Sequence, residues 1–417
     1  MLKQPRVRVG AYCLAVTALI ATPAAGQIAA LPLNAPLAGP LGAPSSCPAA
    51  FTDSIASRDL AALDRVAAIA PVWDTYSLAN HALLLVADTT HRGSAETPVC
   101  AATWRHGREL RVVEVARRPQ LSTPLYGMLA LDTVGSGASV KDAAAVAAAQ
   151  LPDPDLARVL RADDIARLVV LPFPLDFAGL GALGAAMRAA GVNPALLQAD
   201  FAVHESFHLH VQFPEWLDQP GIYAWPQWDR QPDRVQLRER CYAGSRDVAD
   251  AVQREHAALL AAFDALDSLD SANGRRAVLA HAARFVERRT ERYRLLDTVR
   301  VEMDGRPASC AAAEDVMELQ EGTAQWVGHA TTVGAGLVTR SGKRGSYARP
   351  QPEAFYQLAP LQLWVLDALL SDDEMRVLTA ALARSPGPSA PRATVFASFQ
   401  AIIRDAVRDA GSRPAAR

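Results

Sequence analysis

Apolar residues recur along residues 193–213 closely enough to predict a helix that is buried over most of its surface. Asn193 is a favourable N-cap residue, and Pro194 suits the first helical position, where no N–H group is needed. Pro214 ends the segment, because proline lacks the N–H group that a helix interior requires. The pattern therefore predicts one helix at about the middle of the chain.

Beyond residue 220, charged residues alternate with Ala, Leu and Val at helical spacing, which predicts mainly helical structure. The expected helices span residues 232–265, 274–301, 311–333, 352–370, 372–384 and 390–410. Asn273-Gly274 marks one of the connections between them. The apolar run at residues 361–370 is too short to span a membrane.

A smaller region of mixed structure is expected over residues 51–135. It holds one expected helix, residues 60–70, and strand-like runs separated by polar turns at residues 82–86, 110–115 and 126–131. Another strand-like run follows at residues 168–172. The predicted fold class is α+β and mainly α, with a small α/β domain at residues 51–135 and a mainly helical domain at residues 136–411.

The amino terminus has the pattern of a removable signal peptide over residues 1–26. A basic start precedes an apolar run at residues 11–21, and the small residues 24–26 offer a cleavage site. An uncleaved anchor is the alternative. Residues 27–50, rich in Pro, Ala, Gly and Leu, are expected to be a flexible lead-in, and residues 412–417 a disordered tail. The protein is therefore expected to be exported, to the periplasm or the medium.

Four cysteines remain once the signal peptide is set aside: Cys47, Cys100, Cys241 and Cys310. An even number in an exported protein predicts two disulfides, for which three pairings are possible. Proximity in sequence favours Cys47–Cys100 and Cys241–Cys310.

Composition limits the partners. The hydrophobic content of 50% is that of a globular protein, and the net charge of −2 gives no electrostatic reason to bind nucleic acid or an anionic membrane. We therefore expect no nucleic-acid partner, and no stable membrane span after the signal peptide has been removed.

The central helix carries His204, Glu205 and His208 in an H-E-x-x-H arrangement. Histidines four residues apart lie on the same face of a helix, one turn from each other. Two such imidazoles can bind zinc, and the intervening carboxylate can accept a proton from water on the metal. The alternative is a pair of core histidines that hydrogen-bond to the backbone, with Glu205 on a solvated face.

A catalytic zinc requires a third protein ligand and one open position. The metzincin pattern is excluded, because Val211 and Pro214 stand where it requires Gly and His. The expected helix at residues 311–333 supplies three carboxylates: Glu314, Glu318 and Glu321. The last two lie three apart on one face, and the small residues 322–324 would let this helix approach the histidine-bearing helix closely.

Two segments together resemble the gluzincin metallopeptidases: His-Glu-Ser-Phe-His at residues 204–208 and Glu-Gly-Thr-Ala-Gln-Trp at residues 321–326. In many of these enzymes a helix with Glu-Gly-x-Ala-x-aromatic supplies the third zinc ligand. The chain departs from the family pattern in two places. Trp326 stands where Tyr is more usual, and Gln212 lies one place later than in similar His-Glu-x-Phe-His-x-x-Gln helices.

The resemblance implies a zincin-like helical domain that holds Zn²⁺ through His204, His208 and Glu321, with Glu205 as the general base. It also implies that the substrate is a peptide or a protein. The function expected from the sequence is that of an exported zinc-dependent metallohydrolase, most simply a peptidase. The alternative is a non-catalytic zincin-like binding module of the cell envelope.

Further residues are candidates for supporting roles. Tyr356 is the first candidate for the donor that stabilises the oxyanion, with Tyr347 and His329 behind it. Glu318 and Asp200 each lie one turn before a ligand and are candidates for orienting it. The alternatives are a core helix aromatic for Tyr356 and helix-surface charges for the two acids.

Two other motifs are set aside. Asp-Thr-Val-Gly-Ser at residues 132–136 differs from the aspartic-protease turn at Val134 and has no second copy. Gly179, Gly181 and Gly184 form G-x-G-x-x-G, but no second strand carries the acidic residue that a dinucleotide site requires. These glycines are interpreted as a flexible loop. The sequence contains no G-x-S-x-G motif of the serine hydrolases.

Overall fold

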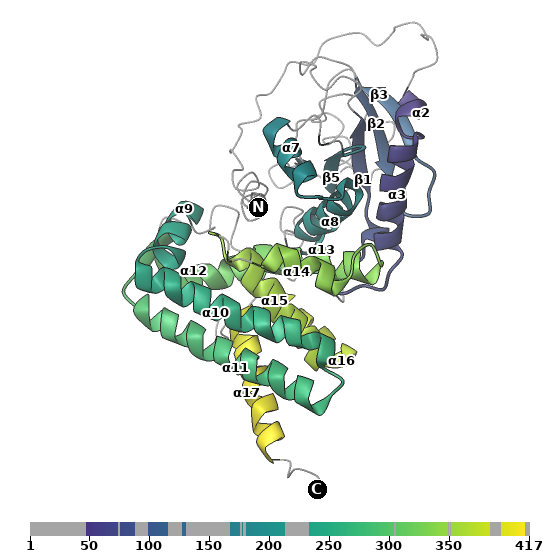
Figure 1. Ribbon diagram of the computed structural model, residues 1–417. Coiled ribbons are helices and arrows are strands. Elements are labelled where there is room, and N and C mark those ends of the chain that lie inside the picture. Colours follow the sequence, from purple (N-terminus) through teal and green to yellow (C-terminus); the bar gives the residue numbers. More distant parts are fainter. Residues whose placement is uncertain are drawn as a thin grey trace, which may run out of the picture. The chain divides into compact units, whose positions relative to one another are not determined.

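The computed structural model describes residues 47–73, 76–87, 99–115, 127–130, 167–175, 177, 181–212, 233–303, 306–348, 350, 352–383 and 393–412. They form two compact units (Figure 1). The first combines the described residues up to Asp64 with those of 79–198, and the second combines residues 65–78 with those from 199 onward. The fold is α+β and mainly helical, which confirms the predicted class.

The predicted terminal segments fall largely outside this description. The signal peptide at residues 1–26, residues 27–46 of the lead-in and residues 413–417 of the tail are not among the described residues. The last four residues of the predicted lead-in form the short helix α2 (Cys47–Ala50), and Ser412 is the last residue of a helix.

The first unit contains a sheet with the strand order β3-β2-β1-β5-β4. The strands are β1 (Leu83–Ala87), β2 (Val99–Trp104), β3 (Arg111–Val115), β4 (Gly127–Ala130) and β5 (Arg167–Pro172). β1 pairs with β5 in parallel, and all other neighbours are antiparallel. Every side chain of β1 is buried, as expected of a central strand covered on both faces. The four predicted strands are present, whereas β2 was not predicted.

The sheet also explains why the unit boundary differs from the predicted one at residue 135. β5 pairs with β1 at the centre of the sheet, so it belongs to the first unit although some 80 residues separate the two strands. Parallel strands require a long crossover connection, and a partner of β1 is therefore found far along the sequence.

Two helices of the first unit correct the sequence predictions. Helix α3 (Ser54–Ala67) begins six residues before the predicted helix at residues 60–70, because Asp53 caps it: the backbone N–H of Ala56 donates to Asp53 Oδ1 at 2.7 Å. Helix α7 (Gly181–Ala189) contains Gly181 and Gly184, so the interpretation of this stretch as a flexible loop is wrong. Gly179 lies outside the described residues.

The second unit is built from helices. They are α9 (Arg234–Gln236), α10 (Arg246–Ala265), α11 (Ala272–Leu295), α12 (Cys310–Met317), α13 (Thr323–Gly334), α14 (Arg340–Tyr347), α15 (Phe355–Leu369), α16 (Asp372–Ala383) and α17 (Val395–Ser412). The hairpin β6 (Arg300–Met303) and β7 (Arg306–Ser309) precedes α12. Helix α15 is buried on all sides from Phe355 to Leu366 and contacts α10, α13 and α17, so it is the centre of this unit.

Several short turns join these elements. The 3-10 turns are η2 (Leu78–Asn80) and η8 (Leu266–Ser268), and η7 (Leu237–Tyr242) is a π-turn. A helix was predicted without interruption over residues 232–265. Instead Ser245 adopts an extended backbone and caps α10, accepting from the N–H of Val248 at 3.2 Å, which separates α10 from η7.

Two more predicted helices differ at their ends. The helix predicted at residues 274–301 begins at Ala272, because Ser271 caps it and Gly274 lies within its first turn. It ends at Leu295, and the following residues instead pair with β7 as strand β6. The strand pairing thus replaces the last turn of the predicted helix.

Both predicted disulfides are confirmed. Cys47–Cys100 joins α2 to β2, and Cys241–Cys310 joins η7 to the first residue of α12. Two disulfides are typical of a protein that folds outside the cytoplasm. Among the residues that the structure describes, no helix combines the length and hydrophobicity needed to cross a membrane.

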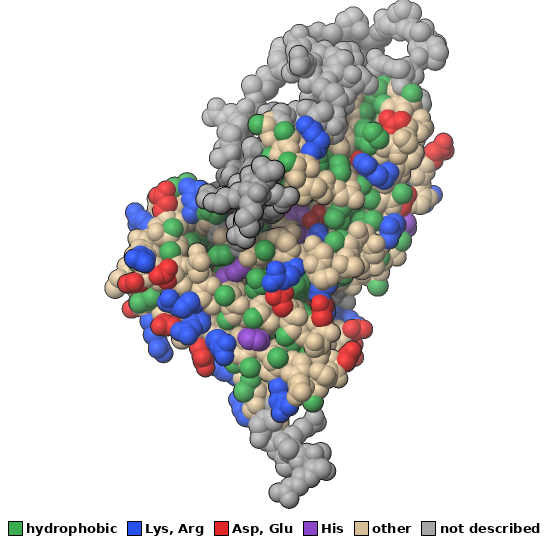
Figure 2. Space-filling view, viewed as in Figure 1, with side chains coloured by type: hydrophobic (Ala, Val, Ile, Leu, Met, Phe, Trp, Pro, Cys, Tyr) green, Lys and Arg blue, Asp and Glu red, His purple; other side chains and the backbone are tan. Residues whose placement is uncertain are grey.

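The exposed helix faces carry charges of both signs. On the face drawn in Figure 2, Lys and Arg side chains are interspersed with Asp and Glu over the helical unit. Some of them connect elements: Arg344 of α14 pairs with Asp264 of α10 at 2.6 Å, and Arg340 pairs with Asp267 at 2.7 Å. Such exposed pairs contribute little to stability, roughly 0–1 kcal/mol each.

Candidate metal centre

The site lies on α8 (Pro194–Phe207), which continues without a break into the π-turn η4 (His208–Gln212). Asn193 caps the helix as predicted, since its Oδ1 atom accepts from the backbone N–H of Ala195 at 3.0 Å. Most of the helix is buried, including Phe207 and Leu209, as the apolar pattern indicates. The expected helix is therefore confirmed, together with the placement of the H-E-x-x-H residues inside it.

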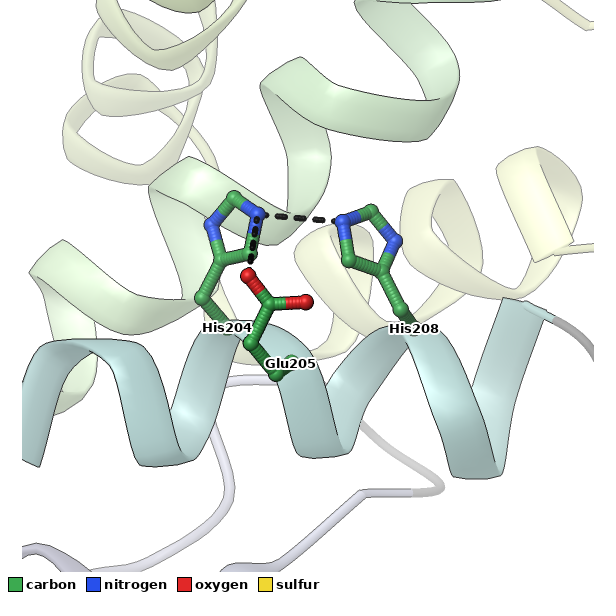
Figure 3. Close-up of side chains that lie close together, drawn as sticks. All are labelled: His204, Glu205 and His208. Atoms are coloured by element: carbon green, nitrogen blue, oxygen red, sulfur yellow. Dashed lines mark hydrogen bonds and ion pairs between the residues drawn. The ribbon is translucent and has the colours of Figure 1, made fainter. Parts of the chain in front are cut away.

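His204, Glu205 and His208 are buried and lie together on this helix (Figure 3). The two Nε2 atoms lie 3.0 Å apart, and Glu205 Oε1 lies 3.9 Å from Nε2 of His204. One ligand atom from each of the three residues falls within 4.8 Å of the others. The group can therefore hold a metal ion.

Glu321 reaches the same point from a second helix. It lies on the π-turn η9 (Glu318–Gly322), between α12 and α13. Its Oε2 atom lies 3.8 Å from Nε2 of His204 and 3.6 Å from Nε2 of His208. A point equidistant from three atoms with these separations lies about 2.0 Å from each, within the range of zinc–nitrogen and zinc–oxygen bonds. Two nitrogens and one oxygen thus fit one small divalent cation.

Two further side chains bind the Glu321 carboxylate. The Tyr356 hydroxyl donates to Oε2 at 2.7 Å, and Nη2 of Arg234 donates to Oε1 at 2.6 Å. Nη1 of Arg234 also donates to the Tyr356 hydroxyl at 3.3 Å. Tyr356 is therefore adjacent to the site, as predicted, but its proton is directed at Glu321. Arg234 was not predicted, because nothing in its sequence context distinguishes it from the many arginines on helix surfaces.

Gln212 connects the two helices that carry the candidate ligands. Its side-chain oxygen accepts from Nδ1 of His208, which leaves Nε2 of this imidazole as the nitrogen that faces Glu321. Nε2 of the Gln212 amide donates to the backbone oxygen of Gln320 at 2.9 Å and to Thr323 Oγ1 at 2.8 Å. A single amide therefore orients one imidazole and holds it against the helix of Glu321.

Burial and neighbouring charges set the protonation states. Burial raises the pKa of the Glu205 carboxyl above its ordinary value, and its buried Oε1 accepts no hydrogen bond from the described residues. Burial also raises the pKa of Glu321, but Arg234 and the two imidazoles outweigh it and hold this pKa well below its usual range. Burial lowers the pKa of His204, whereas Glu321 and Glu205 raise it, with a net upward shift. Glu321 is thus a firmly ionised ligand, and Glu205 a more basic carboxylate.

Glu318 and Asp200, the two candidates for orienting the ligands, make other contacts. Glu318 accepts from Nη1 of Arg289 at 2.6 Å and from Nε2 of Gln362 at 3.1 Å. Asp200 pairs with Nζ of Lys343 at 3.1 Å, and its Oδ2 atom lies 3.3 Å from Nε2 of His329. These contacts are to residues outside the group of His204, His208 and Glu321.

The remaining candidates for the oxyanion donor, His329 and Tyr347, are hydrogen-bonded to each other. Nδ1 of His329 contacts the Tyr347 hydroxyl, which also accepts from Nε1 of Trp364 at 3.2 Å. Together with Lys343 and the half-buried Asp200 they form a polar cluster between α8, α13 and α14.

Of the small residues 322–324, Thr323 lies against the histidine-bearing helix, where its Oγ1 accepts from Gln212, whereas Gly322 does not. A Cβ atom on Gly322 would meet Ala359 at 2.3 Å, so this glycine faces α15 and not the histidine-bearing helix. A Cβ atom on Gly328 would meet Oδ1 of Asp200 at 2.6 Å, so Gly328 is a small residue that α13 presents to α8.

Comparisons of the chain with protein families, with curated proteins and with solved structures give no match.

Proposed function

We propose that the protein is an exported, zinc-dependent metallohydrolase that cleaves peptide bonds. The observation that carries this proposal is the convergence of Nε2 of His204, Nε2 of His208 and Oε2 of Glu321 within 3.0–3.8 Å of one another. Three ligands of this kind leave a fourth position of a tetrahedral zinc site free, which is the arrangement of catalytic zinc. The gluzincin-like sequence segments around these residues support the same assignment.

The donor set favours zinc over calcium and magnesium. Two imidazoles and one carboxylate suit zinc, whereas calcium and magnesium prefer an all-oxygen environment. Bound there, zinc would lower the pKa of water to about 7 and polarise a substrate carbonyl.

Glu205 is the general base of the proposed reaction. Its Oε1 atom is buried, is free of hydrogen bonds from the described residues and lies 3.9 Å from Nε2 of His204. It accepts a proton from the water whose oxygen attacks the carbonyl carbon, and it then gives this proton to the leaving nitrogen as the C–N bond breaks. Protons and bonds balance with water as the only co-reactant.

The proposed location is the periplasm or the medium. The signal-peptide pattern over residues 1–26 and the two disulfides support it, because disulfides persist in oxidising compartments. The proposed substrate class is a peptide or a protein.

One experiment tests metal and activity together. The chain without residues 1–26 is purified under oxidising conditions, its zinc content is measured, and its hydrolysis of casein and of a mixed peptide library is followed. Glu205→Gln should keep stoichiometric zinc and lose at least about 100-fold in turnover. The matched control is Glu239→Gln, whose side chain is 66% exposed and which should leave both readouts unchanged.

Two results would contradict the proposal in different ways. Full turnover by Glu205→Gln would remove the assigned base. Stoichiometric zinc without any hydrolysis by the unmodified protein would instead favour the alternative, a non-catalytic zincin-like binding module.

A further inference from the structure

Arg234 holds the oxygen of Glu321 that faces away from the two imidazoles. Its side chain is 12% exposed, and its two terminal nitrogens contact Glu321 and Tyr356. We infer that Arg234 restricts Glu321 to metal binding through Oε2 alone and so keeps one coordination position open. This inference rests on the proposed metal site and assigns a positioning residue to it.

The two carboxylate oxygens of Glu321 have different neighbours. Oε1 accepts a short, charge-assisted bond from Arg234 at 2.6 Å, whereas Oε2 faces both imidazoles at 3.6–3.8 Å. Oε2 also accepts from the Tyr356 hydroxyl at 2.7 Å, which leaves a lone pair for a metal. A carboxylate held in this way presents one oxygen to the cation.

The open position depends on this restriction. A four-coordinate zinc with two imidazoles and a carboxylate bound through one oxygen keeps its fourth position for water or substrate. If Glu321 bound through both oxygens, its second oxygen would fill that position. An arginine suits this role better than a lysine, because its planar fork makes two hydrogen bonds in fixed directions.

The short segment that carries Arg234 is tied to the segment that carries Glu321. The backbone N–H of Asp233 donates to the carbonyl of Glu302 at 2.9 Å, and the N–H of Glu302 donates to Oε1 of Gln236 at 3.1 Å. Glu302 lies on β6, whose hairpin leads into α12 and then into η9.

The disulfide Cys241–Cys310 fastens the same two segments a second time. Arg234 is seven residues before Cys241, and Glu321 is eleven residues after Cys310. The backbone on both sides of Arg234 is therefore tied to the segment that precedes Glu321, which fixes the position of the guanidinium relative to the carboxylate.

Cobalt(II) is the probe that tests the inference, because its visible absorption weakens when a fifth ligand is added to a tetrahedral site. The folded protein is titrated with cobalt alone, and the absorption is expressed per bound cobalt at saturation. Arg234→Met removes both donors, and Arg234→Lys restores one. Arg238→Gln is the matched control, one turn later and 39% exposed.

We expect Arg234→Met to bind cobalt about 10- to 100-fold more weakly and to absorb less per bound cobalt. Arg234→Lys should fall between this variant and the unmodified protein, and it serves as the test variant if Arg234→Met does not fold. A lowered melting temperature with an unchanged spectrum per bound cobalt would overturn the inference. If the unmodified protein binds neither cobalt nor zinc, the proposed function itself fails.

Discussion

Glu318 and Glu321 lie three residues apart on one π-turn, and two different arginines hold their carboxylates. Arg289 donates to Glu318 at 2.6 Å inside a cluster of fully buried charges, whereas Arg234 donates to Glu321 at 2.6 Å beside the two imidazoles. Each residue of a π-turn rotates about the helix axis through a smaller angle than a residue of an α-helix. Residues three apart therefore lie further from a common face than they do in a regular α-helix. The two acids therefore serve different purposes, one in the fold and one in the site.

Replacing each of these acids should separate metal affinity from stability. Glu321→Ala removes a candidate ligand and should abolish measurable zinc binding while the protein remains folded. Glu318→Ala removes the closest carboxylate from the buried Arg289, which is then left with Glu255 at 3.6 Å, and should destabilise the fold by about 3–5 kcal/mol, with zinc affinity of the folded fraction retained. Zinc titration and thermal unfolding of both variants provide the comparison. Loss of zinc binding in Glu318→Ala, with zinc binding retained in Glu321→Ala, would instead identify Glu318 as the third ligand.

Gln212 should control zinc affinity through His208. Gln212→Leu removes the acceptor that orients the imidazole and should weaken zinc binding by about 10- to 100-fold. Gln212→Glu keeps that acceptor but loses the donors to Gln320 and Thr323, so it should bind zinc more tightly than Gln212→Leu. Competition with a chromogenic chelator measures the affinities, and the exposed Gln253→Leu is the control. Equal zinc affinity in all three variants would argue against the assigned role.

The two disulfides should differ in their effect on the site. The double variant Cys241→Ala/Cys310→Ala releases η7 from α12 and should cost about 2–5 kcal/mol of stability. It should also weaken zinc binding, because the segments of Arg234 and Glu321 then lose their covalent link. Removing Cys47–Cys100, which lies in the first unit, should leave zinc affinity unchanged. Isothermal calorimetry on both double variants distinguishes these outcomes.

Asp315 should make stability fall as pH rises. Burial and the neighbouring Glu318 raise the pKa of this carboxyl from 3.8 to about 7, although Arg289 opposes the shift. Between these two values the folded state keeps a proton that the unfolded state has released, so stability decreases from about pH 4 to pH 7 and stays lower above it. Asp315→Asn should remove this penalty and stabilise the protein by up to about 4 kcal/mol at pH 8, but far less at pH 4.5.

Denaturant unfolding at both pH values tests this prediction. Asp270→Asn is the control, because Asp270 is exposed and the substitution should have the same small effect at pH 4.5 and pH 8. An Asp315→Asn effect that is equally large at both pH values would show that the carboxyl does not titrate in this range.

The sequence sufficed for those parts of the site that depend on local spacing. The apolar pattern and the cap at Asn193 predict the helix, and the four-residue spacing of His204 and His208 places both imidazoles on one face. The choice of Glu321 over its neighbours followed from a family resemblance and not from spacing. The structure brings this carboxylate to both imidazoles.

Features that depend on distant contacts were not predictable. Arg234 looks like any surface arginine in sequence, and its position follows from hydrogen bonds to β6 and from a disulfide. The strand β2 was missed because it contains two alanines, which have low strand propensity and are buried there by tertiary packing. Gly322 was assigned to the wrong interface, since a sequence does not indicate which neighbour a small residue faces.

Both helices that carry candidate ligands contain a π-turn: η4 begins at His208, and η9 contains Glu321. A π-turn contains about one residue more than an α-helical turn. Gln212, four residues after His208, therefore lies on the side of the helix that a residue three places after His208 would occupy in a regular α-helix. A hydrogen bond from the second histidine to a glutamine can therefore arise in related chains whether the glutamine lies three or four residues later. A pattern that tolerates one inserted residue after the second histidine would group such chains together, whereas a rigid pattern would divide them.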